Sequence, residues 1–362
     1  MTLSAATLLR PILLAGTAFA ALSACSQPEA GDSADDAATG AAEQDAGVVN
    51  VFSARHYSSD DAVYAAFTEE TGIEVNVVEA GGDLLIERVR ADGERSPADV
   101  VITVDAGRLW RAEEAGLFQA APELEEALSN VPSNLVHPEN NWFGFATRVR
   151  GVAYAPDRVD ASEIEDFTDL AGEQFRGRIC VRSSGNVYNQ SLLAALIEAE
   201  GPEAAEAWAA GVVANLARPP QGGDTDQIRA VAAGQCDVAI VNHYYVARLE
   251  RSEDPADSEV AEAVEFAVAD LAGRGAHVNV SGAGLAAGSP NRDNALAFLQ
   301  FLLSDDAQRA FAELTNEYPA VEGAAYENPV LERYGAIEAD PVNVDVLGEN
   351  ASEAQRIFDR VG

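Results

Sequence analysis

The sequence predicts an α/β fold with two doubly wound lobes joined by two crossover strands around a ligand cleft. Short apolar runs alternate with amphipathic stretches over residues 48–116, and the same alternation restarts at residue 178. This alternation is typical of strands and helices in a parallel, doubly wound sheet. Residues 141–154 form a long extended stretch without a helical period, which we interpret as a crossover strand. The length of 362 residues suffices for two lobes.

The first region predicts three strands and three helices. One helix begins with Ser58 or Ser59 as its N-cap and ends at about Thr71, before Gly72. Another helix has Asp105 as its N-cap and stops at Gly116. The predicted strands cover residues 48–52, 73–78 and 99–104, and the remaining helix covers residues 83–91.

The second region repeats this pattern and then returns to the first. Strands are predicted at 178–181, 212–217 and 238–241, with helices at 187–199 and 224–233. Residues 264–268 and 277–285 predict the return crossover, followed by helices within 291–314 and at 351–361. We therefore expect lobe 1 in residues 47–146 and 277–320, lobe 2 in residues 147–276, and a C-terminal helical segment, 321–362, packed on lobe 2.

The first 46 residues carry the features of an exported lipoprotein. Arg10 precedes the apolar run 11–22, which is too short to span a bilayer as a stable anchor. The run ends in Leu-Ser-Ala-Cys, which resembles the lipobox of bacterial lipoproteins; residues 1–24 would be the signal peptide and Cys25 the lipidated residue. Ordinary cleavage after Ala20 is the alternative. Residues 25–46 contain no aromatic or large aliphatic side chain, which predicts a flexible acidic tether.

The composition excludes several classes of function. The 60 acidic residues outnumber 23 basic ones, all of them Arg, and the formal net charge is −37. Without Lys there is no P-loop lysine, no Schiff base to pyridoxal phosphate and no Ser–Lys dyad. The acidity argues against nucleic acid and anionic lipid surfaces as partners, because both need basic patches. It suits a cationic ligand, although a solvated, salt-adapted surface explains most of the charge.

Tyrosines stand at three strand-to-helix junctions. His56 and Tyr57 follow the first strand, Tyr188 begins a helix, and Tyr244 and Tyr245 follow the strand 238–241. Ligands of open α/β sheets bind outside the carboxyl ends of the strands. Phenolate is a hard oxygen donor, whereas calcium and magnesium sites use carboxylates and zinc or copper sites use Cys and His. Clustered tyrosines with one His therefore indicate ferric iron, and the alternative is that they are core or cleft aromatics.

The motifs at these junctions resemble the ferric-iron-binding periplasmic proteins of ABC iron-uptake transporters, in the subgroup that uses one His and four Tyr. The resemblance rests on His-Tyr after the first strand, RSSGNVYNQS, RPPQGGDTDQI and NHYY, and it extends from about residue 48 to the C-terminus. It implies the type II periplasmic-binding-protein fold and a protein that delivers Fe3+ to an ABC permease, and we expect a monomer. The ligands that it implies are His56, Tyr57, Tyr188, Tyr244 and Tyr245.

Charge counting predicts basic neighbours of the metal. Ferric iron with four phenolates and a neutral His carries one surplus negative charge, which a buried Arg can stabilise. Arg55, Arg148 and Arg182 are candidates, unless they serve surface ion pairs; a synergistic anion is a further candidate partner of the iron. Asp105 would face the cleft, although an N-cap role explains it better. His243, where relatives tend to have a small hydroxyl residue, is a candidate for supporting the ligands or for replacing one.

The two cysteines of the second region lie eight residues before Tyr188 and Tyr244, respectively. In a lobe wound in the order 2-1-3, the strands that carry Cys180 and Cys236 are neighbours, so the two side chains would lie side by side in register. The exported compartment is oxidising, which favours a disulfide. Two free buried thiols are the alternative.

Two other functions compete with iron binding. One is the binding of an organic solute or oxyanion in the same cleft, because the helix N-terminus at residues 183–186 can hold an anion. A secreted hydrolase or metalloenzyme is the other, but the chain has no GxSxG or HExxH motif and only 4 His. We therefore expect a binding protein and not an enzyme.

Overall fold

The computed structural model describes residues 47–362 with the exception of His56, and these residues belong to one compact unit. The predicted signal peptide, the acidic tether and Cys25 lie outside the described residues, as does the predicted ligand His56. Within the described part, no helix is long and apolar enough to cross a bilayer.

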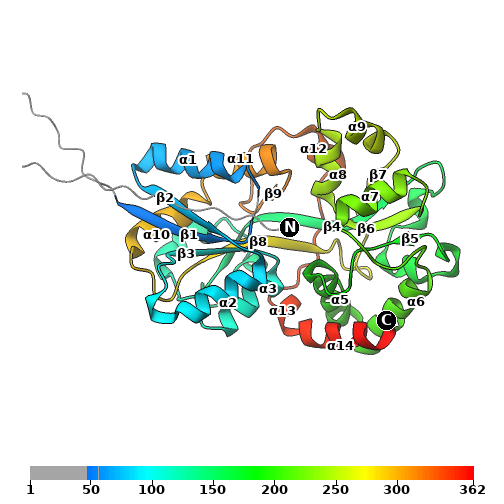
Figure 1. Ribbon diagram of the computed structural model, residues 1–362, viewed down its shortest axis with the longest axis horizontal. Helices are drawn as coiled ribbons and strands as arrows, with labels where there is room; N and C mark the ends of the chain where they lie inside the picture. Colours follow the sequence, from blue (N-terminus) through cyan, green and yellow to red (C-terminus); the bar gives the residue numbers. More distant parts are fainter. Residues whose placement is uncertain (1–46, 56) are drawn as a thin grey trace, which may run out of the picture. The chain divides into compact units, whose positions relative to one another are not determined.

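The strands of the described residues form a mixed sheet in the order β2-β1-β3-β8-β4-β6-β5, and β7 and β9 each pair with β4. They are β1 (Val48–Ser53), β2 (Glu74–Glu79), β3 (Val100–Val104), β4 (Phe143–Tyr154), β5 (Ile179–Cys180), β6 (Val238–Asn242), β7 (Glu265–Ala267), β8 (Val278–Leu285) and β9 (Tyr318–Pro319). Strands β1 to β3 run parallel, as do β5 and β6, whereas β4 and β8 are antiparallel to their neighbours. Two parallel groups of strands therefore flank the antiparallel pair β4–β8 (Figure 1).

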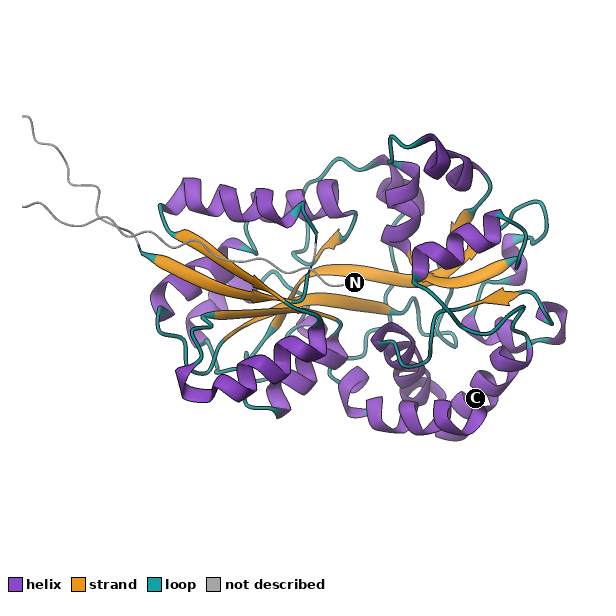
Figure 2. Ribbon diagram, in the orientation of Figure 1, coloured by secondary structure: helices purple, strands orange, loops and turns teal. Residues whose placement is uncertain are grey.

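Helices lie on both sides of the strands (Figure 2). They are α1 (Asp60–Thr71), α2 (Gly82–Asp92), α3 (Ala106–Glu114), α4 (Glu125–Leu128), α5 (Val187–Glu200), α6 (Pro202–Ala214), α7 (Asp224–Ala232), α8 (His243–Glu250), α9 (Pro255–Glu262), α10 (Arg292–Phe301), α11 (Asp305–Ala310), α12 (Pro329–Tyr334), α13 (Val346–Glu349) and α14 (Ala351–Val361). A π-helical turn, η7 (Phe311–Thr315), follows α11.

The first lobe is doubly wound, as predicted. Successive residues of β1 enter different clusters: Val51 packs in one core with Phe67 of α1, and Phe52 packs in another with Leu85 of α2. Helix α1 accordingly lies on the opposite side of the strands from α2 and α3 (Figure 1). A strand buried on both faces has no polar face, which explains why β3 is apolar except for Thr103 and buried throughout.

The second lobe follows the same rule with β6 at its centre. Ile240 shares a cluster with Leu192 of α5, whereas the next residue, Val241, shares another with Leu249 of α8. Strand β5 pairs parallel with β6, and β4 pairs antiparallel on the other side. The carboxyl ends of β5 and β6 therefore point to the same edge of the sheet.

The strand predicted at residues 212–217 is wrong. Helix α6 begins with Pro202 in its first turn and continues to Ala214, and Leu216 makes only an isolated bridge to Ile179. Burial at helical spacing outweighs the β propensity of two adjacent valines, because it places one continuous apolar face against the core. The residues of that face are Ala205, Trp208, Ala209 and Val212.

The predicted crossovers are β4 and β8, which pair side by side between the lobes. All residues of β4 are buried, and its partners change along its length from β8 and β9 to β6 and β7. Residues 264–268 were expected in the return crossover, but β7 lies beside the same end of β4 as β6. The return crossover is therefore β8.

The C-terminal helices α13 and α14 pack against earlier helices of the chain. Helix α13 packs against both α3 and α5, and α14 packs against α5 and α6. In Figure 1, α14 lies beside α5 and α6. The segment after β9 therefore contacts helices of both lobes.

Candidate metal centre

Four of the five predicted ligands lie together in the structure. The hydroxyl of Tyr244 donates to that of Tyr188 across 3.4 Å. The ring of Tyr244 lies 4.3 Å from that of Tyr245 and meets that of Tyr57 edge-on at 6.3 Å, measured between centroids. The fold thus brings together tyrosines from three strand-to-helix junctions that lie far apart in the sequence.

Each ring is placed by the element in which it stands. Tyr188 is the second residue of α5, and Asn186 caps that helix by accepting a hydrogen bond from the Tyr188 N–H at 3.0 Å. Tyr244 and Tyr245 are the second and third residues of α8, directly after β6. Because β5 and β6 are parallel neighbours, the helices that follow them begin at the same edge. Tyr57 arrives from the loop between β1 and α1.

Burial keeps Tyr57, Tyr244 and Tyr245 protonated in the absence of a cation. Tyr244 is fully buried, and Tyr188 is 9% exposed. Burial, reinforced by the neighbouring tyrosines, raises the pKa of Tyr57, Tyr244 and Tyr245 above the ordinary value for a phenol. A cation that is to be bound by phenolates must therefore displace protons from them.

Arginines surround the cluster, including the three that the sequence suggested. The guanidinium of Arg55 lies 4.7 Å from the centroid of the Tyr57 ring. Three more face the ring of Tyr188: Arg182 at 5.2 Å, Arg148 at 5.7 Å and Arg150 at 5.9 Å.

A fifth arginine, Arg248, lies over the rings of Tyr57, Tyr244 and Tyr245 at 5.4, 5.9 and 5.5 Å. It is exposed and makes no ion pair with a carboxylate of the described residues. The sequence reasoning missed Arg248 and Arg150. Helical spacing could have found Arg248, which stands one turn after Tyr244 on α8.

Glu317 links two of these arginines, Arg55 and Arg148. Its carboxylate accepts hydrogen bonds from Arg55 Nη1 at 2.6 Å, Arg148 Nη1 at 3.3 Å and Ser281 Oγ at 2.8 Å. Burial opposes ionisation of Glu317, but the two guanidinium groups outweigh it and hold its pKa below the usual range. Arg55 also pairs with Asp60, with Nε 2.7 Å from Oδ2.

Asp224 links two other arginines, Arg150 and Arg182. It is fully buried at the start of α7 and lies 3.2 Å from Arg150 Nη1 and 3.1 Å from Arg182 Nη1. It also accepts a hydrogen bond from the Asn242 N–H at 2.9 Å. Asp224 therefore fixes the arginines and the residue before α8 in one network.

Asp105 is the N-cap of α3, where its carboxylate accepts a hydrogen bond from Gly107 N–H at 3.0 Å. It also accepts hydrogen bonds from Ser191 Oγ of α5 at 2.5 Å and from Asn279 Nδ2 at 3.0 Å. Its backbone has φ of 86°, an unusual value for a residue with a side chain. Asp105 thus ties α3 to α5 and β8.

His243 uses both ring nitrogens on backbone groups of the protein. Its Nδ1 lies 3.1 Å from Val149 N, and its Nε2 lies 2.8 Å from Asn316 O. Burial lowers the pKa of His243 to about 4, so the ring is neutral at physiological pH. With both nitrogens occupied in this way, His243 adjoins the tyrosines without offering a free nitrogen to a metal.

Cys180 and Cys236 form a disulfide, with their Cα atoms 5.8 Å apart. They are not direct register partners, because Cys180 pairs with Ala239 and Cys236 precedes β6. The bond therefore ties the end of β5 to the residues just before β6.

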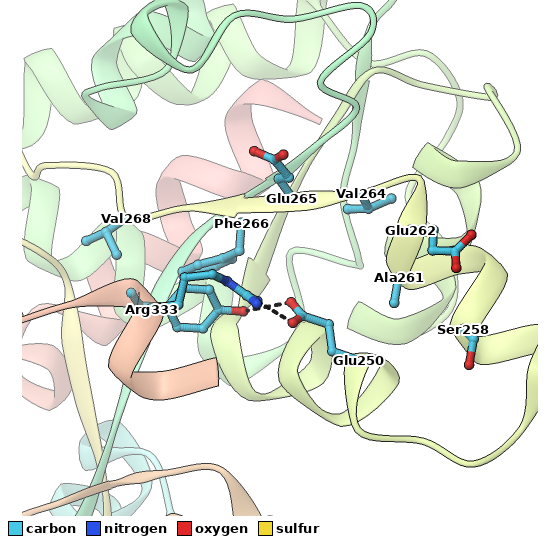
Figure 3. Close-up of a pocket in the computed structure, with 10 residues that line it drawn as sticks. Glu250, Ser258, Ala261, Glu262, Val264, Glu265, Phe266, Val268 and Arg333 are labelled. Carbon is cyan, nitrogen blue, oxygen red and sulfur yellow. Dashed lines mark hydrogen bonds and ion pairs between the residues drawn. The ribbon is translucent and has the colours of Figure 1, made fainter. Parts of the chain in front are cut away.

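A separate hollow of about 840 Å3 lies between α8, α9, β7 and α12. Figure 3 shows Arg333 directed at Glu250, and Tyr334 donates its hydroxyl to the same carboxylate at 3.5 Å. No tyrosine of the cluster lines this hollow. It lies at the C-terminal end of α8, away from the rings at the N-terminal end.

Within the described residues, no group of three or more His, Cys, Asp or Glu is placed to hold a metal ion. The described residues instead bring phenols and arginines together, and phenolate oxygens are hard donors that suit a trivalent cation.

Known proteins are similar to this chain in sequence and in fold. Residues 62–339 match the family model described as bacterial extracellular solute-binding protein. Iron uptake protein A2 of Synechocystis is 49% identical over 318 residues, which cover 87% of this chain and 89% of the relative. Iron uptake protein A1 of the same organism is 43% identical over 360 residues, 98% of each chain.

A solved structure of Trichodesmium FutA (IdiA) in complex with iron and citrate ligands is 47% identical, with a TM-score of 0.82, and the match covers 87% of this chain and 99% of that one. These similarities confirm the fold class and the resemblance that the motifs indicated. The chain therefore belongs to the family of bacterial extracellular solute-binding proteins.

Proposed function

We propose that the protein is the substrate-binding component of an ABC-type iron-uptake system, which binds Fe3+ in the tyrosine cluster and delivers it to a membrane permease. The observation that carries this proposal is the convergence of four tyrosines from three junctions into one buried cluster flanked by arginines. The names of the Synechocystis relatives and the iron in the Trichodesmium structure support it. We propose binding without turnover.

The proposed ligands are the phenolates of Tyr57, Tyr188, Tyr244 and Tyr245, with His56 as a neutral imidazole. Ferric iron bound by four phenolates carries one surplus negative charge. The surroundings supply net positive charge in return, because five arginines adjoin the rings and three carboxylates form ion pairs with them among the described residues. The five arginines are Arg55, Arg148, Arg150, Arg182 and Arg248, and the three carboxylates are Asp60, Asp224 and Glu317.

A synergistic anion is a proposed partner of the iron. The Trichodesmium structure is a complex with iron and citrate ligands, and Arg248 of this chain is exposed and forms no ion pair with a carboxylate of the described residues. A small carboxylate anion bound with the iron would find its counter-charge there.

The delivery cycle follows from where the ligands stand. Tyr57 belongs to the loop after β1, whereas Tyr188, Tyr244 and Tyr245 belong to helices after β5 and β6. Iron bound by both groups stabilises the arrangement in which they meet, since its affinity for that arrangement is higher. Acid releases the metal, because the phenolates take up protons again.

We also propose that Cys25 is lipidated after removal of residues 1–24 and that residues 25–46 tether the protein to a membrane. Mass spectrometry of the mature N-terminus tests this. A diacylglyceryl group on Cys25 is expected, and an unmodified N-terminus at residue 21 would show cleavage after Ala20 instead.

Equilibrium dialysis against ferric citrate, followed by elemental analysis, tests the cargo. We expect about one iron per wild-type chain and a strongly reduced content in Tyr188→Phe. Tyr154→Phe is the matched control, because Tyr154 donates to Glu265 at 2.6 Å, outside the cluster. A wild-type protein without iron, or equal losses in both variants, would contradict the proposed function.

A further inference from the structure

His243 bridges two backbone groups that have no strand partner at that place. The Val149 N–H donates to Nδ1 across 3.1 Å, so Nδ1 carries the lone pair and Nε2 carries the proton. Nε2 then donates to the Asn316 carbonyl at 2.8 Å. The imidazole is fully buried and lies 5.0 Å from the ring of Tyr318.

The position of Val149 explains why a side chain is needed there. On one edge of β4, β9 pairs with residues 146–147 and β6 pairs from Arg150 onward. The neighbouring amide, Arg150 N–H, donates to His277 O on the β8 side, so the Val149 N–H faces the opposite edge. His243 therefore fills the gap between β9 and β6 and satisfies an amide that would otherwise be buried without a partner.

The acceptor, Asn316, is itself fixed from several sides. It has a left-handed backbone with φ of 61°, and its side-chain oxygen accepts hydrogen bonds from Arg251 Nη1 at 2.7 Å and Asn328 Nδ2 at 2.9 Å. Arg251 follows the last residue of α8. Asn316 thus holds α8 near both ends, through His243 at the first residue and Arg251 after the last.

The first residue of α8 is directly followed by the tyrosine pair. The imidazole meets the Tyr244 ring edge-on at 5.8 Å, and Tyr244 is fully buried. Any movement of the His243 backbone is therefore transmitted to Tyr244 and Tyr245.

We propose that His243 is a positioning residue for the metal: by standing in for a strand partner of β4, it holds the N-terminus of α8 and so sets the directions of the Tyr244 and Tyr245 phenolates. This inference rests on the proposed iron-binding function. A residue with a short side chain at position 243 cannot span from Val149 to Asn316.

The test compares His243→Phe with wild type in the full-length protein. Phe keeps a ring against Tyr318 but removes both hydrogen bonds. In the metal-free protein, hydrogen exchange of the Val149 amide should become at least tenfold faster. In the iron-loaded protein, the phenolate-to-iron absorption band should shift, and iron transfer to a chelator should become roughly tenfold faster, because misdirected phenolates bind less tightly.

His243→Gln is the rescue variant, since its amide can again donate to Asn316, and its transfer rate should lie closer to wild type. Arg251→Met is the matched control: it removes the contact of Asn316 with the other end of α8, and should lower stability while leaving the band unchanged.

A His243→Phe protein with wild-type Val149 exchange, or with a wild-type band and transfer rate, overturns the inference. So does an Arg251→Met protein with the same band shift. A colourless wild-type protein refutes the proposed function instead, and the metal-free exchange then still decides whether His243 holds β4.

Discussion

The disulfide between Cys180 and Cys236 offers a prediction whose magnitude follows from the chain itself. The double substitution Cys180→Ala/Cys236→Ala opens a loop with a sequence separation of 56 residues. In the chain-entropy account, a closed loop of this length lowers the free energy of the folded state relative to the unfolded one by about 4 kcal/mol at 25 °C.

The iron affinity of the folded protein should not depend on the disulfide. Strands β5 and β6 remain paired through their backbones, and Asn186 still caps α5 beside Tyr188. Urea denaturation of the metal-free variant should therefore show the loss of about 4 kcal/mol, while the iron affinity of the folded variant stays within about twofold of wild type.

The reasoning is refuted in two ways. A loss below about 1 kcal/mol would mean that the loop is already ordered without the bond, or that the bond strains the native state. A large loss of iron affinity in a variant with wild-type stability would mean that the bond positions Tyr188 and Tyr244.

Three further predictions concern the buried charges. Burial lowers the pKa of His243 to about 4 and that of His277 to about 3, so the folded protein binds fewer protons than the unfolded chain in mild acid. The free energy of unfolding should therefore be full above pH ~6.5 and fall by roughly 4 kcal/mol by pH 5. Urea unfolding at a series of pH values measures this, and a free energy that does not change with pH would contradict it. Because burial raises the pKa of three of the clustered phenols, iron binding at pH 7 should release about three protons or more per ion into a weakly buffered solution, and release of one or none would exclude phenolate ligands. Asp224→Asn removes the anion shared by Arg150 and Arg182 and should lower the free energy of unfolding by roughly 3–5 kcal/mol. Glu87→Gln, in an exposed pair with Arg90, should lower it by less than about 1 kcal/mol. Equal losses in urea unfolding would contradict the buried network.

The apolar strands were predictable because their signal is local. Residues of β3 and β6 are apolar except for Thr103 and Asn242, and turn residues flank both strands, as expected for strands covered on both faces. The end of α6 was not predictable in this way. Val212 and Val213 favour a strand in isolation, and only packing of Trp208 and its helical neighbours shows that the helix continues.

The site was predictable to the extent that its residues follow strands. Tyr57, Tyr188 and Tyr244 stand in the loops and helix starts that follow strands, so their convergence follows from the rule for open α/β sheets. Glu317 gives no such signal, because it lies 262 residues from Arg55, which it binds. The role of His243 likewise depends on where Asn316 lies in the fold.

The most direct test of the iron site is a visible absorption titration of the purified protein with ferric citrate. The wild type should become coloured through phenolate-to-iron charge transfer and saturate at about one iron per chain, while Tyr244→Phe/Tyr245→Phe stays pale. A wild-type protein that stays colourless and binds no iron would contradict the account and leave the tyrosines as the lining of a site for another solute.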